Sequence, residues 1–282
     1  MYFIIHLSIQ KGGRIMDAFK TFLVSNNLAP NTVSAYITAV KGYISDYDDF
    51  TKKNLLAWKA YLIENFKAKT VNLKLQAINK YLEFIKRSNL RIKSVKVQQR
   101  TFLENVISDA DYVFFKKKLK QESNKEWYFI VRFLCATGAR VSELIKIKVE
   151  HVNLGYIDLY TKGGKIRRIY IPIALRKETT AWLKDTLHLE SGYIFLNRFG
   201  DRITTRGISQ QLKKYAVKYG IDPKVVYPHS FRHRFAKNFL EKYNDIALLA
   251  DLMGHESIET TRIYLRKTAS EQQAIVDKIV TW

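Results

Sequence analysis

The sequence predicts a mainly α-helical protein with one small antiparallel β-sheet, arranged as two domains. Apolar residues recur at three-and-four spacing through residues 17–90, which is the period of helices with one buried face. That period is lost in the basic and polar segment 91–105, which we interpret as an interdomain linker. Helical patterns continue through residues 106–282, apart from one alternating stretch, and residues 1–16 form an N-terminal extension.

The first domain is predicted to be a bundle of four short amphipathic helices. Pro30 and the short polar residues after it suit the start of the second helix. The apolar residues that mark the helices are Phe19, Phe22 and Leu23; Val33, Tyr36, Ile37, Val40, Tyr43 and Ile44; Leu55, Trp58 and Leu62; and Leu75, Ile78, Leu82 and Ile85. Lysines occupy the remaining faces, so the bundle is either a DNA-gripping module or a structural bundle with solvated lysines.

The second domain is predicted to consist of helices around a β-hairpin. Ser108 suits the N-cap of its first helix, and a helix that begins at Val141 follows a glycine turn. Residues 152–173 alternate, are rich in Ile and Tyr, and contain a Gly-Gly pair, which indicates the hairpin. The other helices are expected at about 125–137, 174–188, 205–219, 229–242 and 245–253, with a tail helix at about 270–280.

Composition indicates a folded, nucleic-acid-binding protein from a reducing compartment. Of the 282 residues 47% are hydrophobic, too many for a disordered chain, and 48 Lys and Arg against 26 Asp and Glu give a formal net charge of +22. Such an excess repels itself, and an anionic partner such as nucleic acid accounts for it. Cys135 is the single cysteine, so no intramolecular disulfide forms and a cytoplasmic location is expected.

The N-terminal extension opens with a short apolar stretch. This stretch is too short to span a membrane, and it lacks the basic start and small-residue cleavage site of a signal peptide. No membrane association is therefore expected, and Met16 is an alternative start of the chain.

Residues suited to phosphate chemistry occur in three short strings. These are ATGARVSEL, with Arg140 and Glu143 after a glycine turn; HSFRHRF, with His229 and Arg232 one helical turn apart; and LMGHESIETTRIYLRK, with His255 nine residues before Tyr264. Arg262 and Arg266 flank the tyrosine, which places its hydroxyl near positive charge. A tyrosine hydroxyl has a pKa of about 10 and needs such help before it attacks an anionic group. Singly, each string has an ordinary structural explanation.

Two other kinds of site are excluded. His229 and His233 have the spacing of half a zinc finger, but no CxxC accompanies them, so no metal site is expected. The hairpin turn TKGGK resembles part of a phosphate-binding loop. However, Ile166 stands where Ser or Thr should follow, and Leu159 stands where the first glycine should be. No nucleotide site and no cofactor are therefore expected.

Together, the strings resemble the tyrosine recombinases, also called phage-type integrases, in their simple, Xer-like form. The positions that match the family pattern, in the family's order, are Arg140, Lys162 in the hairpin turn, His229, Arg232, His255 and Tyr264. Glu143 matches the acidic residue that the family keeps one turn beyond its first arginine. Lys165 lies close by, but we prefer Lys162 because the family's lysine opens its K-G-x-K turn. Ala139 stands where most members have Leu or Met, and the resemblance covers about residues 17–282.

The resemblance implies a SAM-like helical core-binding bundle followed by an α+β catalytic domain. It also implies that Tyr264 attacks a DNA phosphodiester and becomes joined to the 3′ phosphate, without metal or ATP. The roles implied for the other residues are phosphate binding by Arg140 and Arg232, general acid catalysis by Lys162, hydrogen bonding and proton handling by His229 and His255, and orientation of the site by Glu143.

The partner implied by the resemblance is double-stranded DNA with inverted-repeat sites, on which the protein assembles as a tetramer. The tail helix, with Ile275, Ile279 and Trp282 on one face, would dock onto a neighbouring protomer or fold back onto its own. A cytoplasmic, nucleoid-associated location is expected. Two alternatives remain: a type IB topoisomerase, which uses the same chemistry to relax supercoils, and a DNA-binding regulator that does not cut.

Overall fold

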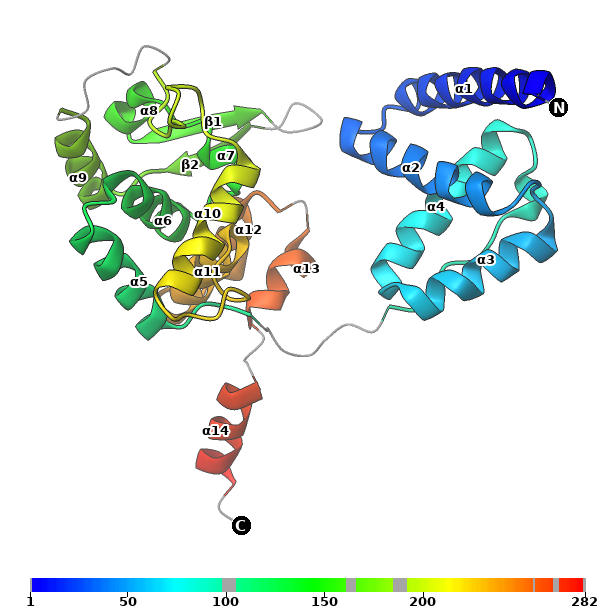
Figure 1. The fold of residues 1–282 in the computed structure, drawn as a ribbon. Helices are drawn as coiled ribbons and strands as arrows, with labels where there is room; N and C mark the ends of the chain where they lie inside the picture. Colours follow the sequence, from blue (N-terminus) through cyan, green and yellow to red (C-terminus); the bar gives the residue numbers. More distant parts are fainter. Residues whose placement is uncertain are drawn as a thin grey trace. The chain divides into compact units, whose positions relative to one another are not determined.

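The structure, a computed structural model, is mainly helical with a small antiparallel sheet, which confirms the predicted fold class (Figure 1). It describes residues 2–97, 105–160, 166–184, 192–255, 257–265 and 269–280, and for residues 2–13 and 269–271 the backbone alone. The chain divides into two compact units, Met1–Gln99 and Arg100–Trp282, here called unit 1 and unit 2. None of the described helices is both long and apolar enough to cross a membrane.

Unit 1 is a helical bundle around an aromatic core. Its elements are α1 Tyr2–Ser25, α2 Pro30–Asp46, α3 Lys52–Asn65, α4 Ala68–Phe84 and the 3₁₀ turn η1 Ser88–Leu90. Pro30 opens α2, where its missing N–H costs nothing, and the Thr51 hydroxyl caps α3 by accepting from a backbone N–H. Phe19 and Tyr81 meet edge to face in the core, with ring centroids 5.0 Å apart.

Helix α1 crosses the boundary that was predicted after residue 16. The helix begins at Tyr2 and continues without a break to Ser25. No proline interrupts this stretch, and each residue added to an existing helix gains one backbone hydrogen bond. The predicted extension is therefore the first part of the helix that also carries Phe19 into the core.

The first part of the predicted linker is held to unit 1. The side-chain amide of Asn79 accepts from the backbone N–H of Ile92 and donates to its carbonyl, with both hydrogen bonds 2.9 Å long. Asn72 does the same with Val95, at 2.8 and 3.0 Å. Because each amide satisfies both backbone groups of its partner, this extended segment is anchored as a strand would be. Residues 98–104 lie outside the described residues.

Unit 2 surrounds its hairpin with helices. The helices are α5 Asp109–Gln121, α6 Lys125–Thr137, α7 Val141–Leu144, α8 Val149–Leu154, α9 Ile173–Lys184, α10 Thr205–Lys218, α11 Pro228–Lys242, α12 Ile246–Met253, α13 Ile258–Thr261, the 3₁₀ turn η2 Arg262–Leu265, and α14 Ala269–Ile279. The strands β1 Tyr156–Tyr160 and β2 Ile166–Tyr170 pair antiparallel, with Tyr156 opposite Tyr170.

The hairpin is shorter than its predicted span. Helix α8 ends at Leu154, and Gly155 stops it in the left-handed conformation, at φ 87°, before β1 begins. In β2, Arg167 and Ile169 face inward while Arg168 faces solvent. The turn that contains Lys162 and Lys165 lies outside the described residues.

Helices α6 and α11 lie against each other (Figure 1). Helix α6 leads toward Arg140, and α11 carries His229 and Arg232. Helix α6 is buried on several sides and ends at Gly138, which adopts φ 62°. A Cβ atom at this position would lie 2.4 Å from the Phe235 ring of α11, so only glycine permits this close approach. The chain then turns directly into α7, which places Arg140 beside α11.

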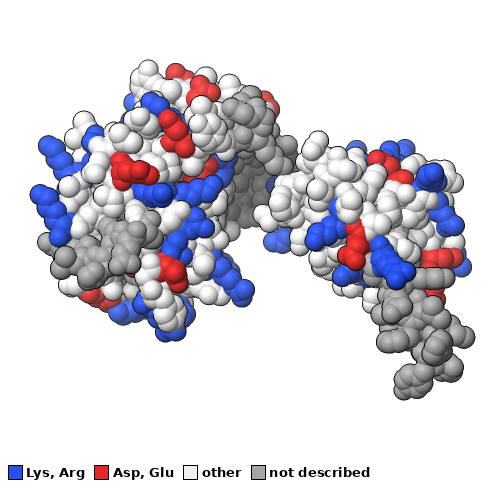
Figure 2. All heavy atoms as spheres, turned by 90° about the horizontal axis from the view of Figure 1, so that it is seen from above, with Lys and Arg blue, Asp and Glu red and all other residues white. Residues whose placement is uncertain are grey.

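Basic side chains are spread over both units, in keeping with the net charge of +22 (Figure 2).

Helix α14 has an exposed apolar face. Its side chains from residue 272 to 280 are exposed, including Ile275 and Ile279 of the predicted apolar face, whereas Trp282 lies outside the described residues. An amphipathic helix with an exposed apolar face needs a partner to bury it.

Candidate active site

The structure brings four of the predicted site residues into one connected cluster. Arg232 contributes from α11, His255 follows α12, and Tyr264 lies in η2. Arg140, at the N-cap of α7, joins them by donating to the carbonyl of Gly254, at 3.2 Å. His229, one turn before Arg232 on α11, lines a pocket together with Arg140. Lys162 lies outside the described residues.

Arg140 is held by Glu143 in a capping arrangement at the start of α7. The Glu143 carboxylate accepts from the backbone N–H of Arg140 at 2.7 Å and from its guanidinium at 2.8 Å. Positive charge and these hydrogen bonds outweigh burial and lower the pKa of Glu143, so it stays ionised. About a third of the Arg140 side chain remains accessible, with an exposed fraction of 38%, so it can meet a ligand.

Arg232 is fully buried and its donors are almost all occupied by protein. Its Nη1 donates to the Gly138 carbonyl at 2.5 Å and its Nη2 to the Met253 carbonyl at 2.7 Å. Burial and then the charges of Arg140 and Arg167 lower its pKa to about 10, which still leaves it charged at neutral pH. Its Nε has no hydrogen-bond partner among the described residues. A buried cation with a spare donor suits an anionic ligand.

His255 lies between Arg232 and α13. Its Nε2 is 3.0 Å from Nη2 of Arg232, and its Nδ1 is 2.7 Å from Oγ1 of Thr261. Burial, followed by the positive charges of the nearby arginines, lowers the pKa of the imidazole to about 4. His255 is therefore neutral at physiological pH.

Tyr264 lies deep in the cluster, with an exposed fraction of 5%. Its ring is 5.2 Å from that of His233 and 6.1 Å from that of His255, centroid to centroid. The positive charge of the Arg232 guanidinium favours the phenolate. Burial outweighs this effect and raises the pKa of Tyr264 above its ordinary value. The resting hydroxyl is thus protonated and needs a base before it can attack.

The arginine before the tyrosine does not belong to this cluster. Arg262 is exposed and pairs with Glu259, one helical turn earlier, at 3.1 Å. The positive charge near Tyr264 comes instead from Arg232 and Arg140, which are distant in sequence. Arg266 lies outside the described residues.

Three functional candidates were missed by the sequence analysis. Arg167 on β2 has a side chain that is 4% exposed, and its guanidinium lies 2.5 Å from the Glu143 carboxylate. The sequence feature that could have identified Arg167 is its place at an inward-facing position of a strand whose side chains alternate between core and solvent. Thr261, next to His255, is fully buried. His233 packs against both His229 and Tyr264, and burial lowers its pKa to about 4.

His229 and His233 are neighbours on α11 and their rings meet edge to face, with centroids 4.8 Å apart. Across the part of the chain that the structure describes, no cluster of three or more His, Cys, Asp or Glu is placed to hold a metal ion. The side chain of His229 reaches solvent. Partial burial of its ring lowers its pKa nonetheless, and the charges of Arg232 and Arg140 lower it further. A neutral, accessible imidazole suits a proton acceptor.

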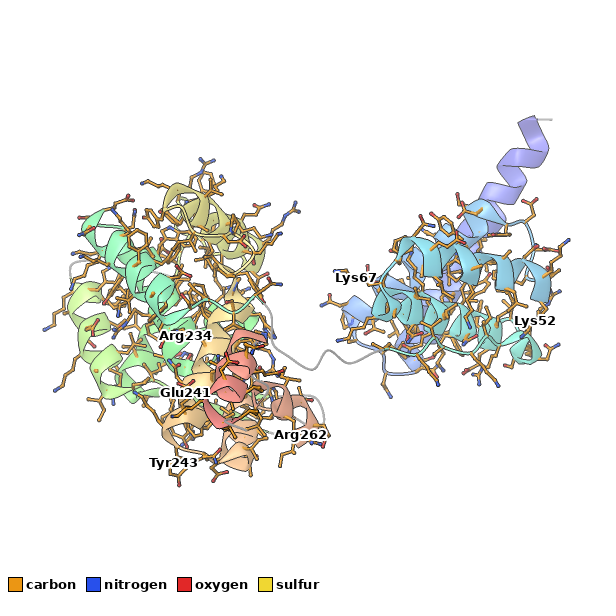
Figure 3. The ribbon with its side chains drawn as sticks, turned by 90° about the horizontal axis from the view of Figure 1, so that it is seen from below. Lys52, Lys67, Arg234, Glu241, Tyr243 and Arg262 are labelled. Atoms are coloured by element: carbon orange, nitrogen blue, oxygen red, sulfur yellow. The ribbon has the colours of Figure 1, made fainter. Side chains whose placement is uncertain are left out.

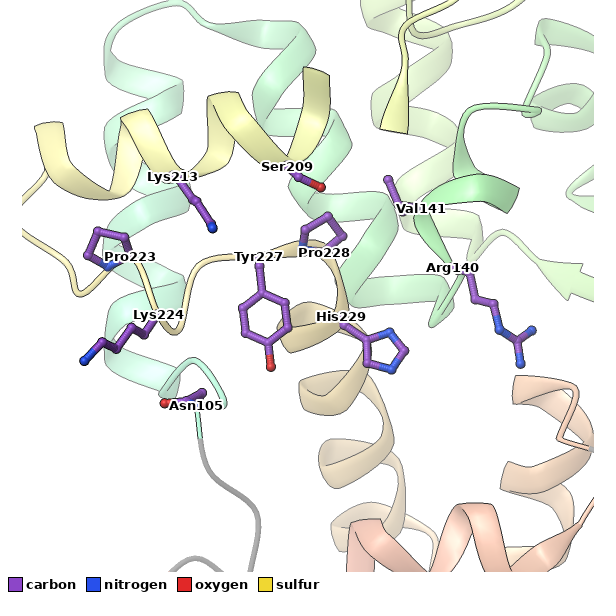
Figure 4. A pocket seen from close by; sticks show the side chains of 10 residues that line it. All are labelled: Asn105, Arg140, Val141, Ser209, Lys213, Pro223, Lys224, Tyr227, Pro228 and His229. Carbon is purple, nitrogen blue, oxygen red and sulfur yellow. The ribbon is translucent and has the colours of Figure 1, made fainter. Parts of the chain in front are cut away.

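A pocket of about 680 Å³ opens beside this cluster. The basic side chains that line it are those of Arg140, Lys213 on α10, Lys224 and His229. In Figure 4, Lys213 and Lys224 lie toward one end of the pocket and Arg140 toward the other. A positively lined hollow next to the buried arginine suits a polyanion that continues past the site.

Three comparisons show which known proteins this chain is similar to. The model of the phage integrase family matches residues 116–271. The chain is 29% identical to the tyrosine recombinase XerA of Pyrococcus furiosus over 276 residues, covering 94% of this chain and 93% of that one. It is 28% identical to the TnP I resolvase of Bacillus thuringiensis, covering 89% and 94%. Its fold resembles a lambda integrase dimer bound to a COC′ core site, with a TM-score of 0.69, 18% identity, and 89% and 76% coverage.

Proposed function

The chain belongs to the phage integrase family, and we propose that it is a site-specific DNA recombinase that cuts and rejoins duplex DNA through a 3′-phosphotyrosyl intermediate. The observation that carries this proposal is a short series of contacts from Arg232 through His255 to Tyr264: Nη2 of Arg232 lies 3.0 Å from Nε2 of His255, and the His255 ring stacks on the Tyr264 ring with centroids 6.1 Å apart. It joins a nucleophile to a phosphate-binding group in one site.

Arg140 and Arg232 bind the phosphate. Arg140 is accessible and held by Glu143, whereas Arg232 is buried and lies 3.0 Å from His255. As Tyr264 attacks, charge grows on the non-bridging oxygens, and two fixed guanidinium groups stabilise it with paired donors. Loss of one such donor typically costs about a hundredfold or more in rate.

Proton transfers accompany the making and breaking of the bonds. The Tyr264 oxygen bonds to phosphorus while the bond to the 5′ oxygen breaks. His229, neutral because its pKa is lowered, takes the phenolic proton. Lys162 gives a proton to the departing 5′ oxygen. The phosphodiester energy is kept in the tyrosyl bond, so a second 5′ hydroxyl reverses the step without ATP.

Recombination requires several protomers on DNA. A tetramer on inverted-repeat sites supplies them, with unit 1 gripping the duplex through its lysines. The exposed residues Ile275, Val276 and Ile279 of α14, with Val280 just after it, support docking of this helix onto a neighbouring protomer. The similar XerA of Pyrococcus furiosus is a tyrosine recombinase, and the similar lambda integrase is a dimer bound to a core site, which supports DNA binding by more than one protomer.

The test is covalent trapping on a nicked suicide duplex, which loses its 5′ end after cleavage. We expect wild-type protein to form an adduct with one duplex from a set tiled through the DNA that flanks its gene, and Tyr264→Phe to form none. Tyr243→Phe is the matched control, because Tyr243 is 58% exposed at the end of α11 (Figure 3). An adduct with Tyr264→Phe would contradict the assignment.

The same proteins separate the two alternatives. Relaxation of a supercoiled plasmid that lacks the trapped sequence would favour a topoisomerase. Binding to the duplexes without an adduct from any of them would favour a regulator that does not cut.

A further inference from the structure

Thr261 is a buried hydroxyl that the mechanism above does not use. It lies at the end of α13, three residues before Tyr264, and its residue has an exposed fraction of 0%. Its Oγ1 is 2.7 Å from Nδ1 of His255. A hydroxyl in this position is shielded from water, so its hydrogen bond to the imidazole is not easily replaced.

The contacts of His255 determine which ring nitrogen carries the proton. Nη2 of Arg232 lies 3.0 Å from Nε2, and a guanidinium can only donate, so Nε2 must accept. A neutral imidazole then carries its proton on Nδ1. In this state Nδ1 donates to Thr261, whose oxygen accepts. His255 therefore has no N–H on Nε2, the nitrogen that faces Arg232.

Phosphate binding demands the opposite arrangement. The non-bridging oxygens of a phosphodiester only accept hydrogen bonds, so an imidazole that binds them must present an N–H. If a phosphate takes over the Nη2 donor of Arg232, Nε2 of His255 loses its donor and faces an acceptor. The proton then belongs on Nε2, and Nδ1 must find a donor in its turn. A hydroxyl can accept in the first state and donate in the second, which valine or alanine cannot do.

We propose that Thr261 is a positioning residue whose hydroxyl allows His255 to change from the Nδ1–H to the Nε2–H tautomer when the scissile phosphate enters the site. The inference rests on the proposed function for the identity of the phosphate. No proton is gained or lost overall: the Nδ1 proton passes to water, another proton arrives at Nε2 from water, and the Thr261 hydroxyl rotates so that it donates to Nδ1 where it had accepted. Thr261 thereby links phosphate entry to the turn that holds Tyr264.

The tautomer can be measured directly by long-range ¹H–¹⁵N spectroscopy of ¹⁵N-histidine-labelled protein. His255 is assigned from the resonances that His255→Asn removes. We expect Nδ1–H in the DNA-free protein, and Nε2–H in a complex of Tyr264→Phe with the duplex that traps the wild type. Nε2–H without DNA, or Nδ1–H retained in the complex, would overturn the proposal. The first spectrum needs no substrate, so it is decided even if the proposed function fails.

Single-turnover cleavage of the nicked duplex tests the hydroxyl itself. Thr261→Val keeps the shape but removes the hydroxyl, and we expect cleavage to slow by about a hundredfold, as for loss of one phosphate donor, with DNA affinity unchanged. Thr261→Ser should restore most of the rate. Thr260→Val is the matched control, because Thr260 is exposed beside it, and it should cleave like wild type. Equal loss in the serine and valine variants would show that packing matters instead of the hydroxyl.

Discussion

The Arg167 guanidinium and the Glu143 carboxylate form a buried ion pair 2.5 Å apart beneath the candidate active site. Arg167 also donates to the carbonyl of Leu252 from Nε and Nη2, at 3.2 and 2.9 Å. Its side chain fills the space beside Gly254, where a Cβ would lie 2.1 Å from Cδ. One side chain on β2 thus supports both the carboxylate that holds Arg140 and the turn that leads into His255.

Removal of this guanidinium should therefore destabilise unit 2. We expect Arg167→Met to lower the free energy of unfolding by about 3 kcal/mol or more, because it leaves a buried carboxylate with one partner fewer. The measurement is denaturant unfolding at neutral pH. Arg168→Met is the matched control: Arg168 also pairs with a carboxylate, that of Asp158, but at the surface, and such pairs contribute about 1 kcal/mol or less. Equal losses in the two variants would contradict the buried role.

Gly138 should tolerate no side chain. Its φ of 62° disfavours other residues, and an added Cβ would lie 2.4 Å from the ring of Phe235. We expect Gly138→Ala to lower stability by more than about 1 kcal/mol and to impair cleavage, because the Gly138 carbonyl holds Arg232. Gly42 lies inside α2 with no atom near an added Cβ, so Gly42→Ala should raise stability by about 0.5–1 kcal/mol. Thermal unfolding of both variants decides the matter, and a neutral Gly138→Ala would count against the close approach.

Arg232→Lys should remove cleavage while keeping a positive charge. An ammonium group cannot span the carbonyls of Gly138 and Met253 and also reach His255, so we expect single-turnover cleavage to fall about a hundredfold or more. Arg234, two residues later on α11, pairs with Asp109 instead and is labelled on that helix in Figure 3. Arg234→Lys should lose stability at most, with cleavage per folded molecule retained. Comparable loss of cleavage in both would mean that helix integrity, not the guanidinium, is being tested.

Acid should destabilise the protein through its buried histidines. Burial lowers the pKa of His233 and of His255 to about 4, below the ordinary 6.5. Between these values the unfolded chain binds more protons, so both contribute stability above pH 6.5 that is lost as pH falls toward 4. Glu126 acts in the opposite sense, because burial raises its pKa to about 7.

The difference between variants isolates one of these groups. We expect His233→Asn to reduce the proton uptake on unfolding near pH 5 by up to one proton, measured as the slope of unfolding free energy against pH. Glu126→Gln should steepen the same slope. An unchanged slope in His233→Asn would show that this imidazole titrates normally in the folded protein.

Local patterns in the sequence determined the helices, the hairpin and the residues proposed for the site. Helical period, strand alternation and glycine turns are properties of neighbouring residues, so they can be read without knowing the fold. The strings around Arg140, Arg232 and Tyr264 were recognised differently, by their resemblance, in order, to the pattern of the tyrosine recombinases. The local patterns misplaced local boundaries, such as the start of the hairpin, because α8 ends only at Gly155.

Tertiary structure alone decided which polar groups would be buried together. Arg167 meets a carboxylate 24 residues away and a carbonyl 85 residues away, and no local period encodes those partners. Thr261 lies only six residues from His255, yet its burial and the proton position that we infer depend on Arg232, which comes from another helix. A buried polar side chain is stable only with its partners in place, so its role becomes visible when distant segments have packed around it.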